Sequence, residues 1–89
     1  MRNFSLLAAQ VRAARGLLNW TQGYLAEGIN VSRATIIDLE SCKREPHEAT
    51  LFVLMNELAA AGIDFTDTGV KFRKWPAKMY VPTGIKQKS

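Results

Sequence analysis

The chain has 89 residues, of which 47% are hydrophobic, and this length and composition fit one small domain with a single core. One cysteine, Cys42, excludes an intrachain disulfide, and a single histidine without paired metal-ligand spacing argues against a zinc site or another metal site. No apolar run approaches the roughly 20 residues of a membrane helix, and no secretion signal is recognisable. We therefore expect a cytoplasmic protein with no membrane partner and no cofactor.

The net charge of +4 is unevenly distributed along the chain. Residues 1–69 contain six Lys and Arg against eight Asp and Glu, a net charge of −2, whereas residues 70–89 contain six basic residues and no acidic one. The basic C-terminal part suits an anionic partner such as nucleic acid. The alternative is a solvated tail that only keeps the protein soluble.

Four helices are predicted in the first two thirds of the chain. Apolar residues recur at helical spacing over residues 5–18, and Asn19 then suits a left-handed cap. Thr21 precedes a short second helix at 22–29, which needs packing to be stable. Ser32 is the natural cap of a third helix that reaches about residue 41. After a loop, a fourth helix spans about residues 48–61, and Gly62 closes it.

After Gly62 the hydrophobic pattern changes from helical to alternating. Apolar and polar residues alternate on both sides of Asp67-Thr68-Gly69, which predicts a short β-hairpin from about residue 63. Exposed strand edges pair readily, so this hairpin is a candidate dimer element, unless it packs back on its own domain. Prolines and a glycine argue against regular structure from residue 74 onward. We expect a domain of residues 1–73 and a basic, flexible tail of residues 74–89.

Residues 22–41 have the composition of a helix-turn-helix unit. Ala26 is small where two helices would cross, and Asn30 suits the sharp turn between them. The positions expected to face inward are all apolar: Leu25, Ile29, Val31, Ile36 and Leu39.

The third helix has a strip that its apolar positions leave uncovered. A rotation of about 100° per residue places five residues roughly opposite the buried side: Arg33, Ala34, Ile37, Asp38 and Ser41. An exposed strip on a protruding helix fits the major groove of DNA, although an ordinary solvated face would have the same pattern. Ile37 favours a partner, which is either a thymine methyl group or protein.

Two stretches, VRAARGLLNWTQGYLAEGINVSRATIIDLES and REPHEATLFVLMNELAAAGIDF, resemble the phage-repressor (Cro-like, lambda-repressor-like) helix-turn-helix family. The resemblance covers about residues 7–73. It implies a mainly α fold, a bundle of four to five helices with a helix-turn-helix, to which the predicted C-terminal β-hairpin is added. It also implies a sequence-specific DNA-binding transcriptional regulator, a repressor that reads the major groove with the helix at 32–41 as a homodimer.

The resemblance further implies which residues bind DNA: Gln22, Ser32, Arg33, Ala34, Thr35, Ile37, Asp38, Lys43 and Arg44. Gln22 would bond a phosphate or brace a recognition side chain, and Lys43 and Arg44 would hold phosphates. We expect Arg33 to read a guanine, because its planar fork matches the two acceptors on that base, although it would otherwise bind only phosphate. Asp38 would accept from a cytosine amino group or orient Arg33.

Residues away from this surface match structural positions of the same family. Arg15 and Glu40 match an ion pair between the first and third helices, and Trp20 is expected to fill the core. Tyr24 and Ile37 depart from the family pattern, because commonly polar residues are replaced there, and Cys42 stands where glycine often ends the recognition helix.

Two classes of function remain open. The first is a regulator that binds double-stranded DNA, either a phage-type repressor or the antitoxin of a toxin–antitoxin pair. The second is a protein-interaction module that keeps the fold but binds a toxin, polymerase or other regulatory protein, as the net charge of −2 over residues 1–69 and the apolar Ile37 would allow. An enzyme is not expected, because the sequence has no paired carboxylates, no nucleophile beside a base, no phosphate loop and no metal set.

Overall fold

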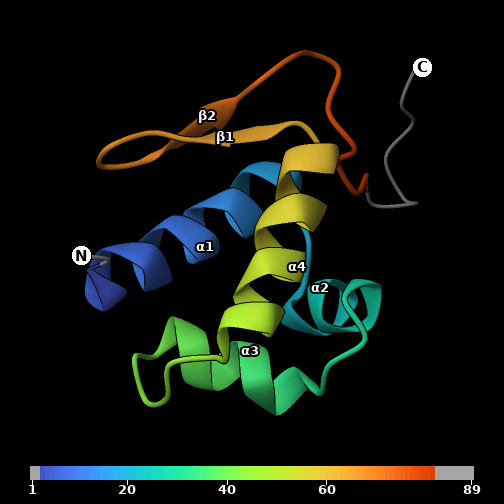
Figure 1. Ribbon diagram of the computed structural model, residues 1–89. Coiled ribbons are helices and arrows are strands. Elements are labelled where there is room, and N and C mark those ends of the chain that lie inside the picture. Colours follow the sequence, from blue (N-terminus) through green and yellow to red (C-terminus); the bar gives the residue numbers. More distant parts are fainter. Residues whose placement is uncertain (1–2, 82–89) are drawn as a thin grey trace.

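The computed structural model describes residues 3–81 and shows a bundle of four helices followed by one β-hairpin. The helices are α1 (Phe4–Leu18), α2 (Gln22–Gly28), α3 (Arg33–Glu40) and α4 (Glu48–Ala60), and the strands are β1 (Ile63–Phe65) and β2 (Val70–Phe72). The predicted fold class is confirmed, and each predicted helix has its observed counterpart within one or two residues at either end. Figure 1 shows α4 crossing in front of α1, the hairpin beside α1 at one end of the molecule, and α3 at the other end.

The predicted helix caps are present. The Thr21 side chain accepts a hydrogen bond from the Tyr24 backbone N–H at 3.0 Å, and the Ser32 side chain accepts from the Thr35 N–H at 3.3 Å. Asn19 ends α1 in the left-handed conformation with a φ of 57°. These polar groups satisfy backbone donors and acceptors that a helix end leaves unpaired. The short elements α2 and α3 therefore have defined ends although neither is long enough to be stable alone.

One hydrophobic core joins all four helices and β1. Leu18, Leu25, Ile36, Leu54 and Ile63 are among its largest fully buried side chains. Trp20 is also buried, so the prediction that it fills the core is confirmed. The helices consequently form a single packed unit, and the position of α3 is fixed by the whole domain.

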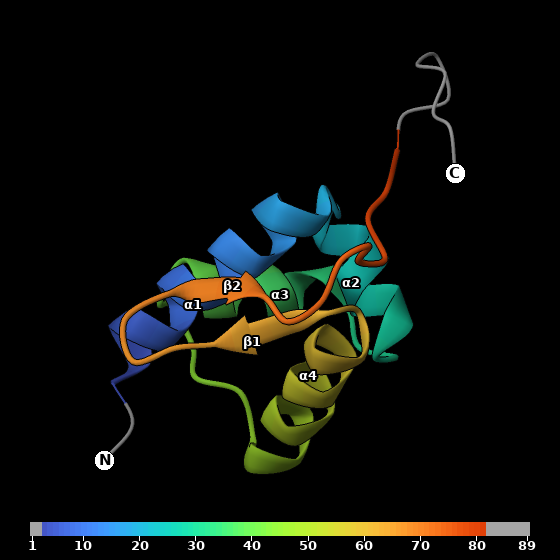
Figure 2. The same cartoon turned by 90° about the horizontal axis from the view of Figure 1, so that it is seen from above.

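The hairpin has the predicted turn and packs on its own domain. Its two strands are antiparallel, with Ile63 opposite Phe72 and Phe65 opposite Val70. The buried Gln10 side chain of α1 donates hydrogen bonds to two carbonyls of the turn, those of Thr66 at 2.8 Å and Gly69 at 2.9 Å. Figure 2 shows the hairpin lying along α1 and across the end of α4. These contacts therefore support the predicted alternative, in which the hairpin packs on its own domain.

Residues 73–81, which we call the strap, follow the hairpin without helix or strand and remain attached to the domain. The strap donates from the Arg73 N–H to the Gly62 carbonyl at 2.6 Å and from the Lys78 N–H to the Ala61 carbonyl at 2.9 Å. It also donates from the Tyr80 N–H to the Leu18 carbonyl at 2.8 Å. Hence the strap spans the ends of α4 and α1. The expected division at residue 73 stays a prediction, and the last part of the expected tail, residues 82–89, lies outside the described residues.

No helix among residues 3–81 is long and apolar enough to cross a membrane.

Candidate nucleic-acid interface

The helix-turn-helix unit consists of α2, a tight turn and α3. Leu25 and Ala26 of α2 are buried, and α2 packs closely on α3. Asn30 takes a φ of 60°, the left-handed conformation predicted for it, and the next N–H, that of Val31, donates to the Ala26 carbonyl at 3.0 Å. The small side chain of Ala26 and the left-handed turn together bring α3 against the core at a fixed angle.

An ion pair from α1 anchors the C-terminal end of α3. The Arg15 guanidinium donates through Nε and Nη2 to the two oxygens of Glu40, at 2.7 and 2.8 Å, which confirms the expected pairing. Glu40 is buried, and its hydrogen bond with Arg15 raises the pKa of that guanidinium above its ordinary value. Arg12 of α1 donates to the backbone carbonyl of Glu40 as well. Two arginines one turn apart on α1 therefore hold the last turn of α3.

Gln22 belongs to the same buried network. Its side-chain N–H donates to the Glu40 carboxylate at 3.0 Å, and its side chain is half-buried. The structure thus shows Gln22 fixing α2 to the anchored end of α3. The second N–H of its amide is the group left for the phosphate contact predicted from sequence.

The outward face of α3 carries the residues predicted to meet bases. Ser32, Arg33 and Ala34 are exposed, while Thr35, Ile37 and Asp38 are half-buried. Within residues 3–81 the Arg33 guanidinium makes no hydrogen bond or ion pair. Ile36 and Leu39 are buried beneath this face, as predicted. The exposed side of α3 is therefore free of the described part of the chain and is anchored from below.

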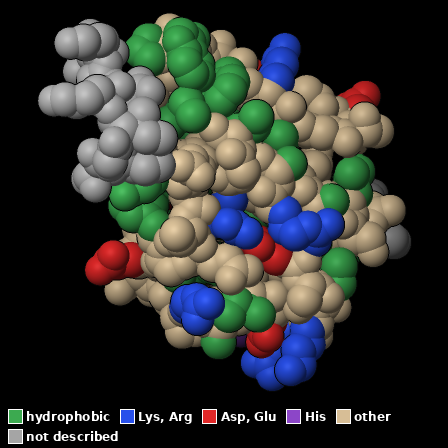
Figure 3. Space-filling view, turned by 180° about the vertical axis from the view of Figure 1, so that it is seen from behind, with side chains coloured by type: hydrophobic (Ala, Val, Ile, Leu, Met, Phe, Trp, Pro, Cys, Tyr) green, Lys and Arg blue, Asp and Glu red, His purple; other side chains and the backbone are tan. Residues whose placement is uncertain are grey.

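The turn after α3 places the two predicted phosphate contacts beside this face. Cys42 takes a φ of 62°, and the N–H groups of Lys43 and Arg44 both donate to the Asp38 carbonyl, at 2.8 and 3.2 Å. Both basic side chains are exposed. Figure 3 shows basic side chains along the lower edge of the molecule, over α3 and the turn that follows it. Although residues 1–69 have a net negative charge, they present basic side chains at the end of the molecule where α3 lies.

A groove beside α3 contains residues that the sequence did not single out. Its volume is about 540 Å³, and its lining includes Thr35 and Arg44 together with His47 and Thr50. The last two lie at the start of α4, which the turn after α3 brings close to α3. The hydroxyl, imidazole and guanidinium donors of this lining suit the oxygens of a DNA backbone, whereas the Glu45 carboxylate, which also lines the groove, would repel them. The polar residues at the start of the predicted fourth helix were the sequence feature that could have pointed to His47 and Thr50 as groove residues.

Comparisons with known proteins agree with this geometry. A family model described as helix-turn-helix matches residues 11–60, which run from within α1 to the end of α4. No curated protein matches the chain significantly. A chain of the solved HipA–HipB–O2–O3 complex is similar, with 27% sequence identity and a TM-score of 0.59, and the match covers 66% of this chain and 83% of that chain.

The family model spans more than half of the chain and includes both helices of the helix-turn-helix unit and the α1 arginines that anchor it. Its members are DNA-binding regulators, not enzymes. The chain belongs to the Cro/C1-type, lambda-repressor-like helix-turn-helix family of DNA-binding regulators.

Proposed function

We propose that the chain is a sequence-specific transcriptional repressor of the cytoplasm that inserts α3 into the major groove and binds DNA as a homodimer. The observation that supports this most is the outer face of α3, which the described residues leave uncovered. Arg33 at its start has no partner among residues 3–81, and buried side chains anchor the helix from beneath. With its side chains, a helix such as α3 is about 10–12 Å in diameter. A helix of this kind fits the major groove, which is about 12 Å wide.

Each side chain of the interface has a distinct part in this proposal. Arg33 reads a guanine through its two parallel donors, and Ala34 and Ile37 offer apolar contact to a thymine methyl group. Asp38 accepts from a cytosine amino group or orients Arg33. Ser32, Thr35, Gln22, Lys43 and Arg44 hold the backbone on either side, and such contacts fix the register without reading sequence.

A second copy is expected because one small module buries little surface on DNA. The outer side of α4 offers an apolar contact for that copy, since Phe52 is 68% exposed and Val53 is 44% exposed. In Figure 1, α4 lies in front while α3 lies at one end. Two copies that meet through α4 about an axis directed at that end would therefore present both α3 helices to the same duplex, as two half-sites require.

Two measurements test the proposal. First, a preferred duplex is selected from random sequences, and its affinity is measured over a range of salt concentrations, where log affinity should fall linearly with log salt. Second, Arg33→Ala is compared with Lys71→Ala, which removes an exposed positive charge from β2. We expect Arg33→Ala to cost about 1–3 kcal/mol on the selected site and to relax preference at one base position. Lys71→Ala should change affinity little and specificity not at all.

An equal effect of the two substitutions would remove Arg33 as the reading residue. Absence of any salt-dependent binding to duplex DNA would contradict the repressor proposal itself and leave the protein-interaction module, which was the second class predicted from sequence.

A protein partner is a second part of the proposal. The similar chain comes from a complex that joins HipA and HipB, and this favours an antitoxin-like regulator that also binds a toxin or another regulatory protein. The test is co-purification of the chain with the product of a neighbouring gene, followed by measurement of DNA binding by the pair. A partner that forms a stable complex and alters operator affinity would support this part, and independence of the two proteins would contradict it.

A further inference from the structure

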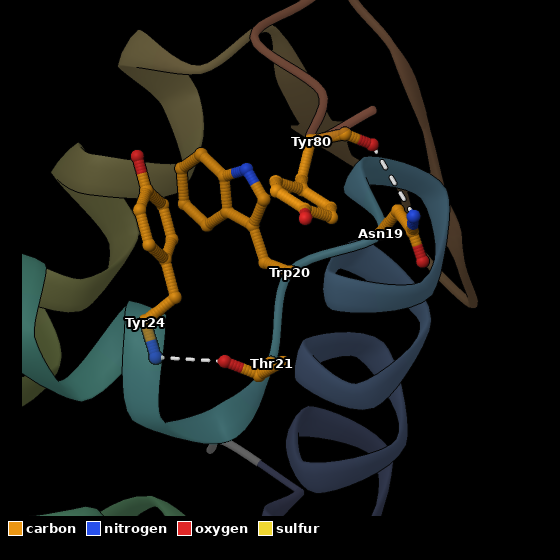
Figure 4. A pocket seen from close by; sticks show the side chains of 5 residues that line it. All are labelled: Asn19, Trp20, Thr21, Tyr24 and Tyr80. Atoms are coloured by element: carbon orange, nitrogen blue, oxygen red, sulfur yellow. Dashed lines mark hydrogen bonds between the residues drawn. The ribbon is translucent and has the colours of Figure 1, made fainter. Parts of the chain in front are cut away.

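The strap meets α1 and α2 at an aromatic pocket that the DNA-binding proposal does not use. Figure 4 shows the Trp20 indole between the rings of Tyr24 and Tyr80. Trp20 and Tyr24 meet edge to face, with ring centroids 5.0 Å apart. Asn19 and Thr21 complete the lining of a mainly apolar pocket of about 200 Å³. This volume is below the range of about 300–1,000 Å³ that small-molecule sites occupy, so the pocket suits one inserted side chain better than a cofactor.

The strap next to this pocket has one edge that is hydrogen-bonded to the domain and one edge that is not bonded to any residue among 3–81. Lys78 and Tyr80 use both backbone groups inward: their N–H groups donate to α4 and α1 ends, and their carbonyls accept from the Trp20 indole at 2.9 Å and the Asn19 amide at 3.2 Å. Met79, between them, makes no backbone hydrogen bond to any residue among 3–81. Bonding at every second residue leaves an outer edge that an extended peptide can join through its main chain.

The side chains at this edge are apolar and the charge around them is positive. Tyr80 is 50% exposed and Tyr24 is 55% exposed, and Met79 and Val81 are exposed too. From Val70 to the end of the strap the chain contains no acidic residue and four basic ones, Lys71, Arg73, Lys74 and Lys78, of which Arg73 is paired with Asp64. A second copy of this chain that met this edge with its own strap would bring the same cations to the contact and be repelled. An acidic segment would instead be attracted.

We propose that the outer edge of the strap and the Trp20–Tyr24–Tyr80 pocket form a docking site for an extended, acidic segment of a partner protein that inserts one apolar side chain into the pocket. The strap lies at the end of the molecule away from α3 (Figure 1), whereas Thr21 and Tyr24 of the pocket flank Gln22, the phosphate contact proposed on α2. Only the position of the site relative to bound DNA rests on the proposed function. Peptide binding is measured without DNA and does not depend on that function.

The test uses the full chain as bait for a displayed library of random peptides. The proposal expects enriched peptides to contain acidic residues around one aliphatic or aromatic residue. Their binding should weaken about tenfold or more in Tyr80→Ala, which removes a wall of the pocket, and in Lys78→Glu, which reverses a charge. Both substitutions keep the inward backbone bonds of the strap.

Phe52→Ala is the matched control, because Phe52 is an aromatic side chain as exposed as these but lies on α4. It should leave the affinity of each protomer for the peptide unchanged, although it truncates the apolar contact proposed for the second copy. Thermal unfolding should stay near that of the unsubstituted protein in Tyr80→Ala and Lys78→Glu. Binding to the selected duplex should stay unchanged in Tyr80→Ala, which removes no charge, and this separates the site from α3.

Three results would overturn the proposal. One is that no peptide is enriched, and another is that the enriched peptides lack acidic residues or bind Tyr80→Ala as well as the unsubstituted chain. The third is displacement of the peptides by a short single-stranded oligonucleotide whose own binding is lost in Tyr80→Ala, because basic residues beside aromatic rings also suit nucleic acid bases and the occupant would then be nucleic acid. Loss of DNA binding by Arg33→Ala has no bearing on any of these outcomes.

Discussion

Two arginine–carboxylate pairs in this domain have the same Nε–oxygen distance of 2.7 Å and differ in burial. The side chains of Arg15 and Glu40 are 21% and 4% exposed, whereas those of Arg73 and Asp64 are 52% and 35% exposed. Removing one partner of a buried pair leaves an uncompensated charge and costs about 3–5 kcal/mol, while an exposed pair contributes about 0–1 kcal/mol. The two pairs therefore share one distance but differ in burial and in the second bond that Arg15 makes to Glu40 through Nη2.

We expect Arg15→Met to destabilise the domain by about 3 kcal/mol, the lower end of that range, because Gln22 still donates to the remaining carboxylate. Arg73→Met should cost less than about 1 kcal/mol. Urea unfolding followed by circular dichroism measures both differences. In thermal unfolding the first change corresponds to a fall in Tm of about 12–24 °C for a domain of this size. The double variant Arg15→Met/Glu40→Met removes both charges and should recover most of the loss.

Equal costs for Arg15→Met and Arg73→Met would refute this reasoning. Burial would then not set the strength of the Arg15–Glu40 pair, and this pair would not be what fixes the last turn of α3.

Three further predictions concern stability and are checked by urea unfolding. Cys42→Gly should stabilise by about 0.5–1 kcal/mol, because glycine takes the φ of 62° without strain, whereas Ser41→Gly, at a φ of −95°, should destabilise. Gln10→Leu should cost about 1 kcal/mol and speed hydrogen exchange in the hairpin turn, since two carbonyls of the turn lose the donor that the buried Gln10 side chain supplies. Gly16→Ala, in open space within α1, should gain about 1 kcal/mol, and Gly62→Ala, at a φ of 108° with Ala77 Cβ 3.1 Å away, should lose stability.

Local sequence signals predicted the helical part of the fold well. Thr21, Ser32 and Asn19 act at the helix ends, and each does so through its own side chain or backbone conformation within a few residues. The hairpin was similarly predicted from alternation and a polar turn. Such features depend on short-range physics, so a single sequence is sufficient to find them.

Contacts between distant segments were not predictable in the same way. Nothing in the periodicity indicates that the Gln10 amide meets the hairpin turn or that the Trp20 indole donates to the Lys78 carbonyl, since 56 to 59 residues separate these groups. The Arg15–Glu40 pair was expected only through family resemblance. For the candidate site, the exposed strip of α3 follows from helical geometry, while the base contacts of Arg33 and Asp38 stay predictions, because they depend on a DNA sequence that the chain does not encode.

The strap also changes how the charge of the C-terminal part should be studied. Deleting the chain after Arg73 would remove basic residues, but it would also leave the buried indole N–H of Trp20 without its acceptor and uncover the ends of two helices. The DNA affinity of a shortened protein would therefore reflect a structural defect as well as the loss of charge. Neutralising Lys74 and Lys78 by Gln keeps every backbone bond of this segment, so it is the cleaner way to weigh the contribution of these charges to DNA affinity.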